Sequence, residues 1–364
     1  MPLMFRGLGT AVPEQSVNQT ESTTLSEWVS ADRPERASLV RRIQRRSQVQ
    51  TRGSVLLTGD ATQTIHQRLP FYGVNSPRTE ERMEAYRLNA SLLALKACKR
   101  ALAESQLSAG VITHLITISC TGFHAPGVDC DLIDQLQLSP NVQRTHIGFM
   151  GCHAALNGLR VARAFVEADP KAVVLLCAVE LCSVHLQYGW NPEHVVANTL
   201  FADGAAALVA THAETSNPKS TSGKVALQAS GSTVIPKTHD LMHWQIGDHG
   251  FSMGLSPKVP EAISTSLQPW LNDWLHASGT DLNSIQHWAI HPGGPRILQA
   301  CAESLSLSDD QLAHSREILS QHGNMSSATI LFVLDQMRQH DCHGPCVALA
   351  FGPGLCAEVA LITL

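Results

Sequence analysis

The sequence predicts an internally duplicated α/β fold that is built in layers. Short, almost wholly apolar segments alternate with segments of helical periodicity, which is the pattern of strands covered by helices on both faces. The elements fall into two series, and in each series residues with chemical potential stand at element ends. Of the 364 residues, 44% are hydrophobic and 16% are charged, as in proteins with a large core. We expect two halves, residues 1–220 and 221–364, within one compact body.

The first half is predicted from apolar periodicity and from turn signals. Leu92, Leu93 and Cys98 lie near one face of a helix, and small apolar residues recur at helical spacing from Ala154. Short apolar runs that end in turns such as Cys120-Thr121-Gly122 indicate strands. The expected elements are a helix over 88–103, a strand over 114–119, a helix after Pro126, strands over 142–150, 172–179 and 205–211, and a helix from Ala154.

The second half repeats this alternation. The expected elements are strands over 225–235, 287–290, 346–351 and 358–364, and helices over 260–276, 311–321 and 326–338. The sequence contains no short-period repeat and no low-complexity linker, which favours halves that pack together.

Composition and charge exclude several classes of protein. The formal net charge of −5 gives no indication of a nucleic-acid-binding surface. The sequence lacks an apolar run of the roughly 18–20 residues that a membrane helix needs, and lacks a signal-peptide pattern, so we expect a cytoplasmic protein. Ten cysteines are scattered through apolar segments, which favours reduced thiols. Cys342 and Cys346 have no second ligand pair at matching spacing, so a loop is favoured over a metal site.

Three residues in Gly-rich turns are the candidates for chemistry. Cys152 follows a predicted strand and precedes a predicted helix, and a helix N-terminus favours a thiolate and offers backbone N–H groups to an oxyanion. His291 begins His-Pro-Gly-Gly, and Asn324 follows Gly323. An imidazole can activate a thiol, and an amide donates hydrogen bonds without adding charge. The alternatives are a buried structural cysteine, a surface or core histidine, and an asparagine that caps the next helix.

Five segments in this order resemble the type III polyketide synthases, the chalcone and stilbene synthase-like enzymes of the thiolase superfamily. They are Gly151-Cys152, Leu200-Phe201-Ala202-Asp203-Gly204-Ala205-Ala206-Ala207, His291-Pro292-Gly293-Gly294-Pro295, Gly323-Asn324-Met325-Ser326-Ser327 and Phe351-Gly352-Pro353-Gly354. The resemblance implies a thiolase-like αβαβα layered fold with internal duplication. It also implies a homodimer that uses acyl-CoA and malonyl-CoA as substrates and needs no other cofactor.

The resemblance implies a role for each of the three candidates. Cys152 would accept an acyl group from CoA, and His291 would keep Cys152 as a thiolate. His291 and Asn324 would polarise the thioester carbonyl of malonyl-CoA, so that loss of CO₂ gives a stabilised enolate. The enolate would then attack the thioester on Cys152 in a Claisen condensation.

The resemblance also implies where substrate lies. Phe201 and Met253 match the two gatekeeper positions, although plant enzymes have Phe at the second. Trp244 stands at the floor of the cavity, where plant enzymes usually have Gly, which is a feature of the microbial branch. The partner subunit would reach the cavity at the position of Ala125. The other residues expected at the substrate are Cys120, Thr121, Cys182, His185, Pro353 and Ser326.

A basic segment runs from Arg41 to Arg52 and has two interpretations. It is either a solvated helix face or, as the resemblance implies for Arg46 and Arg52, a contact for CoA phosphates. The starter is also open. We expect a medium- or long-chain fatty acyl starter that gives an alkylpyrone or alkylresorcinol; the alternative is a malonyl-CoA-only synthase of a small polyhydroxylated aromatic.

Three further classes of protein are weighed against this interpretation. A ketoacyl-carrier-protein synthase III-like enzyme also uses Cys, His and Asn, but in that family Gln-Ala-Asn usually follows the His, whereas Pro-Gly-Gly follows His291. A thiol hydrolase is disfavoured by the small, apolar neighbourhood of Cys152. A non-catalytic partner subunit is disfavoured because all three candidate residues are present.

Overall fold

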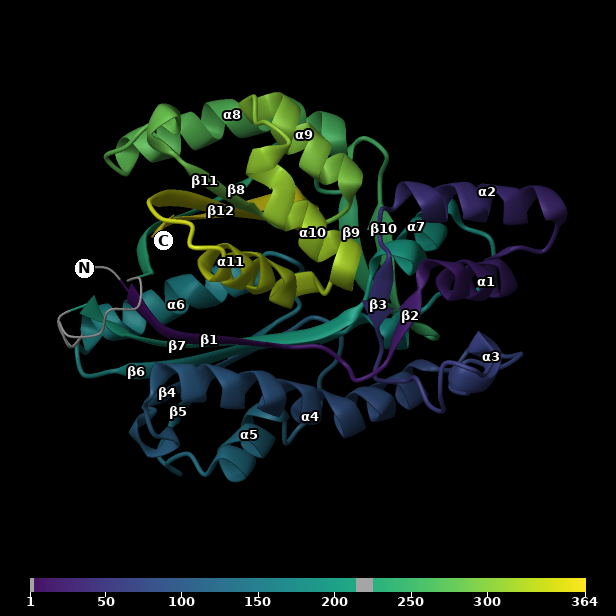
Figure 1. Cartoon of the computed structure of the whole chain (residues 1–364), viewed down its shortest axis with the longest axis horizontal. Helices are drawn as coiled ribbons and strands as arrows, with labels where there is room; N and C mark the ends of the chain where they lie inside the picture. Colours follow the sequence, from purple (N-terminus) through teal and green to yellow (C-terminus); the bar gives the residue numbers. More distant parts are fainter. Residues whose placement is uncertain (1–2, 214–224) are drawn as a thin grey trace.

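The computed structural model describes residues 3–213 and 225–364. Five layers are stacked in it: helices, sheet, helices, sheet and helices (Figure 1). The expected layered α/β architecture is therefore confirmed. The expected division between residues 220 and 221 lies outside the described residues.

The strands are hydrogen-bonded in one order, β11-β12-β13-β8-β1-β7-β6-β4-β5. The two halves of this order meet at a short seam, where β1 pairs with β8 through Leu3 with Leu227 and Met4 with Ala226. The strands are β1 Leu3–Ala11, β4 His114–Ser119, β5 Gln143–Gly148, β6 Val173–Leu181, β7 Asp203–His212, β8 Ala226–Val234, β11 His287–Ile290, β12 Pro345–Gly352 and β13 Cys356–Thr363.

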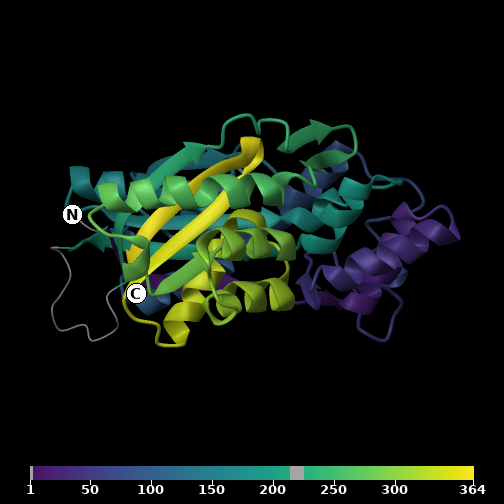
Figure 2. The ribbon, with the colours of Figure 1, turned by 90° about the horizontal axis from the view of Figure 1, so that it is seen from above.

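Helices fill the other three layers. α4 Thr79–Ser105 and α5 Val128–Leu136 cover the outer face of the N-terminal strands, and α8 Val259–Ala277 and α9 Pro295–Leu305 cover the C-terminal strands (Figures 1 and 2). α6 Ala154–Ala168 and α11 Thr329–Gln339 lie between the sheets, beside α10 Ala313–His322. α6 can approach β4 and β6 closely because it contains Gly158. A Cβ at Gly158 would lie 2.6 Å from the side chain of Ile118 in β4 and 2.7 Å from that of Leu176 in β6.

The remaining elements gather at one end of the molecule, where the N-terminal helices project in both ribbon views (Figures 1 and 2). They are α1 Gln19–Ser30, α2 Pro34–Arg46, α3 Ile65–Arg68 and α7 Pro192–Leu200, the strand pair β2 Ser16–Asn18 and β3 Thr51–Gly53, and the hairpin of β9 Met242–Gly247 and β10 Gly250–Leu255.

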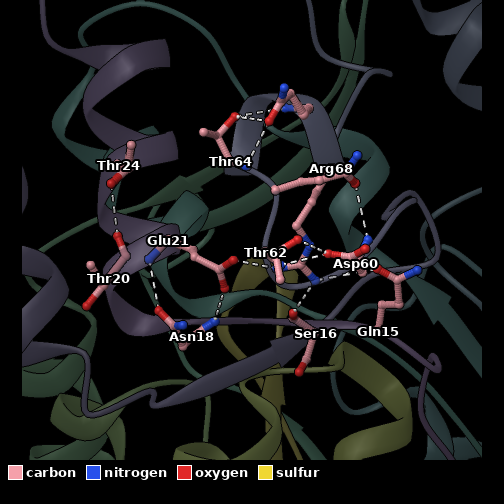
Figure 3. A network of polar contacts seen from close by, with 12 residues as sticks. Gln15, Ser16, Asn18, Thr20, Glu21, Thr24, Asp60, Thr62, Thr64 and Arg68 are labelled. Atoms are coloured by element: carbon pink, nitrogen blue, oxygen red, sulfur yellow. Dashed lines mark hydrogen bonds and ion pairs between the residues drawn. The ribbon is translucent and has the colours of Figure 1, made fainter.

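Polar contacts hold this end together (Figure 3). Asn18 caps α1 by accepting a hydrogen bond from the Glu21 N–H, and the Glu21 carboxylate accepts one from the Asn18 N–H. The buried Arg68 donates to the Glu21 carboxylate and to the Ser16 carbonyl. α3 is therefore fixed to the start of α1 and to β2.

The predicted elements agree with the structure in most of the core. The strands over 114–119 and 287–290 match β4 and β11 in full, whereas the helix predicted over 88–103 begins earlier, as α4 at Thr79. The helix predicted from 326 opens with a 3₁₀ turn, Ser326–Ala328, before α11. Sequence reasoning missed β1, α1, α7, α9 and the β9–β10 hairpin. Within the described parts of the chain, none of the helices combines the length and hydropathy that crossing a bilayer requires.

Candidate active site

The turn before α6 presents Cys152 to a cavity. Phe149 and Gly151 have φ values of 60° and 82°, and a Cβ on Gly151 would lie 2.2 Å from Cδ of Pro353. Only glycine fits this left-handed position so close to a proline ring. Cys152 is 8% exposed. The turn expected from the sequence is therefore present, with Cys152 directly before the helix.

The turn over residues 323–327, here called the Asn324 turn, comes from the other half of the chain and contacts Cys152. The Ser326 hydroxyl donates to Sγ of Cys152 at 3.6 Å. Burial raises the pKa of the Cys152 thiol to about 11, and hydrogen bonds from Ser326 and Asn324 act in the opposite direction. The donors on this turn therefore favour the thiolate, as a nucleophilic role requires.

Asn324 is held by its main chain and by its side-chain oxygen. Its N–H donates to the Leu200 carbonyl at 2.8 Å, and its carbonyl accepts from the Ala202 N–H at 3.0 Å. Its Oδ1 accepts from the Ser326 N–H at 2.9 Å, so that Nδ2 points to the Gly293 carbonyl at 3.4 Å. Oδ1 thus accepts a hydrogen bond from the backbone as a helix cap does, which was the alternative role of this asparagine. The NH₂ group faces the turn that begins at His291 and can still donate to a ligand.

His291 directly follows β11, and its ring makes no hydrogen bond within the described residues. Its N–H donates to the Leu349 carbonyl at 2.8 Å, and the residue is 2% exposed. Both ring nitrogens are buried and have no hydrogen-bond partner among the described residues. Burial and the neighbouring His153 lower the pKa of His291 to about 3. A buried imidazole without partners is rare in a packed core and is typical of a group that meets a ligand.

The opposite pKa shifts of Cys152 and His291 have one cause, the removal of water. Burial disfavours an isolated charge on either residue: a thiolate on Cys152 or an imidazolium on His291. Transfer of one proton from the sulfur to the ring leaves the pair with no net charge, so it avoids much of this penalty.

A largely apolar cavity extends from Cys152. His291 and Asn324 are not part of its wall. A second cavity includes Leu200, Gly293 and Gly294, which lie on the other side of the same turns. The first cavity is lined by the residues that were expected at the substrate: Phe201, Met253, Trp244, Cys120, Thr121, Cys182, His185, Pro353 and Ser326.

Aromatic side chains fix one wall of the first cavity. Trp244 Nε1 donates to the Cys120 carbonyl at 2.8 Å. His185 accepts from the Phe251 N–H at Nδ1, 3.0 Å away, so its Nε2 carries the proton and donates to the Thr121 carbonyl at 2.6 Å. Burial lowers the pKa of His185 to about 3, which keeps it neutral. The wall is therefore apolar and uncharged.

Sequence reasoning missed Glu180, which is fully buried at the end of β6. Its carboxyl group accepts from the Cys120 N–H at 2.9 Å, from the Thr121 hydroxyl at 2.8 Å and from the Ser327 hydroxyl. Burial raises its pKa. An acidic residue in an otherwise apolar strand was the signal in the sequence.

The two arginines expected at CoA phosphates have different surroundings. Arg46 is exposed at the end of α2 and lines the second cavity. Arg52 is 8% exposed, and its guanidinium donates to the Asn198 and Phe201 carbonyls at 2.5 and 2.9 Å. These donors are used inside the protein, and Arg52 also lines the first cavity. Its part in CoA binding stays a prediction.

The cysteine-rich loop near the C-terminus remains a loop. Cys342 Sγ lies 3.6 Å from Nε2 of His314, and the described residues contain no group of three possible metal ligands. All ten cysteines are free thiols.

Comparisons with known proteins match both halves of the chain to one family. The profile of the chalcone and stilbene synthase N-terminal domain matches residues 2–213, and that of the C-terminal domain matches residues 226–364. An "alpha-pyrone synthesis polyketide synthase-like Pks18" of Mycobacterium tuberculosis is 33% identical over 365 residues, which cover 99% of this chain and 91% of that protein. A 1,3,6,8-tetrahydroxynaphthalene synthase of Streptomyces peucetius is 34% identical over 273 residues, 74% of this chain and 72% of that protein.

Solved structures share the whole fold. The crystal structure of PKS-I from the brown alga Ectocarpus siliculosus superposes with a TM-score of 0.92 at 28% identity and covers 100% of this chain and 98% of that one. The C-terminal type III polyketide synthase domain of Steely1 from Dictyostelium gives a TM-score of 0.91 at 28% identity, with 100% and 99% coverage.

Proposed function

Because the chain belongs to the chalcone and stilbene synthase family, the type III polyketide synthases, and is thus an acyltransferase, we propose that it loads an acyl group on Cys152 and extends it with malonyl-CoA. One observation carries this proposal. Ser326 of the Asn324 turn contacts Cys152, and the Asn324 amide reaches the Gly293 carbonyl, two residues after His291, whose ring nitrogens have no partner among the described residues. An apolar cavity lies at Cys152, and a cavity bordered by Arg46 lies at Gly293. CoA thioesters are the only co-substrates that the reaction needs.

Loading begins with transfer of the thiol proton from Cys152 to His291. The thiolate attacks the thioester carbon of acyl-CoA, and the Asn324 amide and the imidazolium stabilise the oxyanion. The C–S bond to CoA then breaks, and His291 returns its proton to the departing CoA thiolate. Net charge inside the site stays constant, as a buried site requires.

Extension uses the same donors on a second substrate. The thioester carbonyl of malonyl-CoA accepts hydrogen bonds from His291 and Asn324, and loss of CO₂ leaves an enolate held by them. The enolate carbon attacks the acyl thioester, the Cys152 thiolate leaves, and the lengthened chain is carried by CoA. The Cys152 thiolate takes up one proton from solvent, which restores the thiol for the next loading. Repeated loading and extension build a polyketide that cyclises in the cavity. Replacing Asn324 by Ala should lower the rate about 10²–10³-fold.

The second cavity supports a route for CoA. Arg46 and Arg296 contribute to its wall, and Gly293 and Gly294 bring it to the candidate catalytic turn. We expect Arg46→Glu to raise KM for malonyl-CoA with little change in kcat, because a phosphate contact acts equally in the ground and transition states. An unchanged KM would remove Arg46 from the CoA site.

The first cavity supports an aliphatic acyl starter. Its wall also includes Val17, Leu25, Leu57 and Leu69. Leu69 directly follows Arg68, whose contacts hold α3 against α1 (Figure 3). Apart from the buried Arg52, whose guanidinium donates to protein carbonyls, the wall is largely apolar and suits an alkyl chain. The product would then be an alkylpyrone or alkylresorcinol.

A series of acyl-CoA starters of increasing length, with products identified by mass, tests this assignment. Leu69→Trp should shorten the longest accepted chain, whereas Val74→Trp, at a side chain that is 93% exposed, should not. Product from malonyl-CoA alone at every starter length would refute the fatty acyl assignment. That outcome would favour the second candidate, a synthase of a small polyhydroxylated aromatic. The bulky Trp244, which lines the cavity and donates a hydrogen bond to the Cys120 carbonyl, supports this candidate.

The rival carrier-protein enzyme is separated by the same assay. If only acyl-carrier-protein substrates react, the chain is a ketoacyl synthase III-like enzyme. If Cys152→Ala still forms product, the proposed nucleophile is wrong.

We also propose a cytoplasmic homodimer, with free thiols as support for the compartment. β5 is the last strand of the sheet order, and large apolar side chains are exposed at Met150, which follows it, at Phe123, which contacts Phe149, and at Leu88 and Leu92 on α4. Ala125 lies in the loop between Phe123 and α5. Leu92→Asp should yield monomers in analytical ultracentrifugation, because a buried unpaired charge opposes association.

A further inference from the structure

Arg52 is a buried cation whose hydrogen bonds go to neutral groups. Nη1 donates to the Asn198 and Phe201 carbonyls, and Nη2 donates to the Ser22 hydroxyl. Burial lowers the pKa of Arg52 to about 10, and the charge of Asp203 acts in the opposite direction. Burying a guanidinium in this way is costly, so the position of Arg52 calls for an explanation.

The two carbonyls belong to the C-terminal end of α7. Asn198 is in its last turn, and Phe201 is the residue after the helix. Carbonyls at a helix end lack partners within the helix and carry a partial negative charge. Arg52, which comes from β3, therefore caps α7 from another element of the fold.

The segment that Arg52 caps is hydrogen-bonded to Asn324. Leu200 accepts from the Asn324 N–H, and Ala202 donates to the Asn324 carbonyl. These two bonds flank Phe201 in the sequence, and they pair it with Asn324 as a parallel β-bridge. The guanidinium thus holds Phe201, and the Asn324 backbone holds the residues on either side of it.

The stem of Arg52 touches the Asn324 turn directly. Gly323 has a φ of 72°, and a Cβ there would lie 3.1 Å from Cγ of Arg52 and 2.9 Å from the Leu200 carbonyl oxygen. The absence of a side chain at Gly323 lets the arginine stem pack against the backbone just before Asn324. The head and the stem of one residue therefore contact both segments.

We propose that Arg52 is a positioning residue that locks the Phe201 segment and the Asn324 turn into one rigid unit. The inference rests on the proposed function, in which the Asn324 amide stabilises the enolate. A misplacement of about 1 Å can cost about 10²-fold in rate, so a strut that fixes the amide acts on the chemical step rather than on binding.

The test isolates Asn324 and His291 from the nucleophile. In a Cys152→Ala background, decarboxylation of malonyl-CoA needs only the groups that polarise its carbonyl, and release of CO₂ gives kcat and KM. Arg52→Met keeps the stem and removes the donors, and Arg52→Lys keeps the charge but loses the fork. Arg338→Met is the matched control, because Arg338 bonds to Glu104 and Asp335 away from both cavities.

We expect Arg52→Met to lower kcat about 10- to 100-fold with KM changed by no more than about twofold, and Arg52→Lys to lie between it and the parent. Arg338→Met should lower the unfolding temperature but leave kcat unchanged. If Arg52→Met does not fold, Arg52→Lys alone decides.

Folded Arg52 variants with the parental kcat would overturn the positioning role, as would a loss equal to that of Arg338→Met. Failure of the proposed function gives a different result. In that case the Cys152→Ala parent releases no CO₂, or Asn324→Ala leaves its rate unchanged, and the role of Arg52 falls with it.

Discussion

Removing the imidazole of His291 should change how the reactivity of Cys152 depends on pH. With His291 present, the thiol proton can move to the ring without creating net charge, so Cys152 should be alkylated at neutral pH. Burial raises the pKa of the Cys152 thiol to about 11, and in His291→Ala no imidazole is left to take the proton. With a pKa of about 11, only about one thiol in a thousand is ionised at pH 8, and this fraction rises about tenfold with each pH unit. The thiolate fraction, and with it the alkylation rate, therefore falls as the pH is lowered.

The assay is the rate of iodoacetamide alkylation between pH 6 and pH 10, followed by mass spectrometry of the peptide that contains Cys152. We expect alkylation of His291→Ala at pH 8 to be at least about 100-fold slower than that of the parent, with a curve still rising at the upper end. His314→Ala, a change near Cys342, is the control for loss of a histidine. Superposable curves for the parent and His291→Ala would refute the proton transfer between this pair.

Three substitutions test the geometry of the site. Gly151→Ala forces a Cβ to within 2.2 Å of Pro353 at a φ of 82°, and should reduce product formation more than about 10-fold while circular dichroism still reports a folded protein. Trp244→Ala removes the bond to Cys120 and opens the wall, and should shift products to higher mass in chromatography with mass detection. Gly323→Ala should lower the free energy of unfolding in urea by about 1–3 kcal/mol, because its φ is 72°; an unchanged midpoint would show that the turn relaxes.

The strands over 114–119 and 287–290 were predictable because they are short apolar runs bounded by turn residues. β1 was not, because Leu3–Ala11 mixes apolar residues with Arg6, Gly7, Gly9 and Thr10. Its central place depends on pairing with β7 and β8, which are distant in the sequence. The same holds for the polar helices α1 and α2, whose packing is decided by contacts with other elements.

The candidate site was predictable where a residue has an unusual local sequence. Cys152, His291 and Asn324 stand in Gly-rich turns, and the family resemblance completes the cavity wall. The burial of Arg52 was not predictable, because its neighbours in sequence, such as Arg45 and Arg46, are exposed cations. Only the three-dimensional structure reveals that β3 turns this one side chain inward to the end of α7.

The central place of β1 has a consequence for synthesis on the ribosome. β1 ends at Ala11 and its partner β7 begins at Asp203, 192 residues later, while the seam to the second half needs β8 as well. At about 5–20 residues per second, β1 waits roughly 10–40 s for β7 to be made. During that time its backbone edges are unsatisfied and open to chaperones and to pairing with other nascent chains. The strand that joins the two halves is thus among the first made, and it pairs only with strands that are made much later.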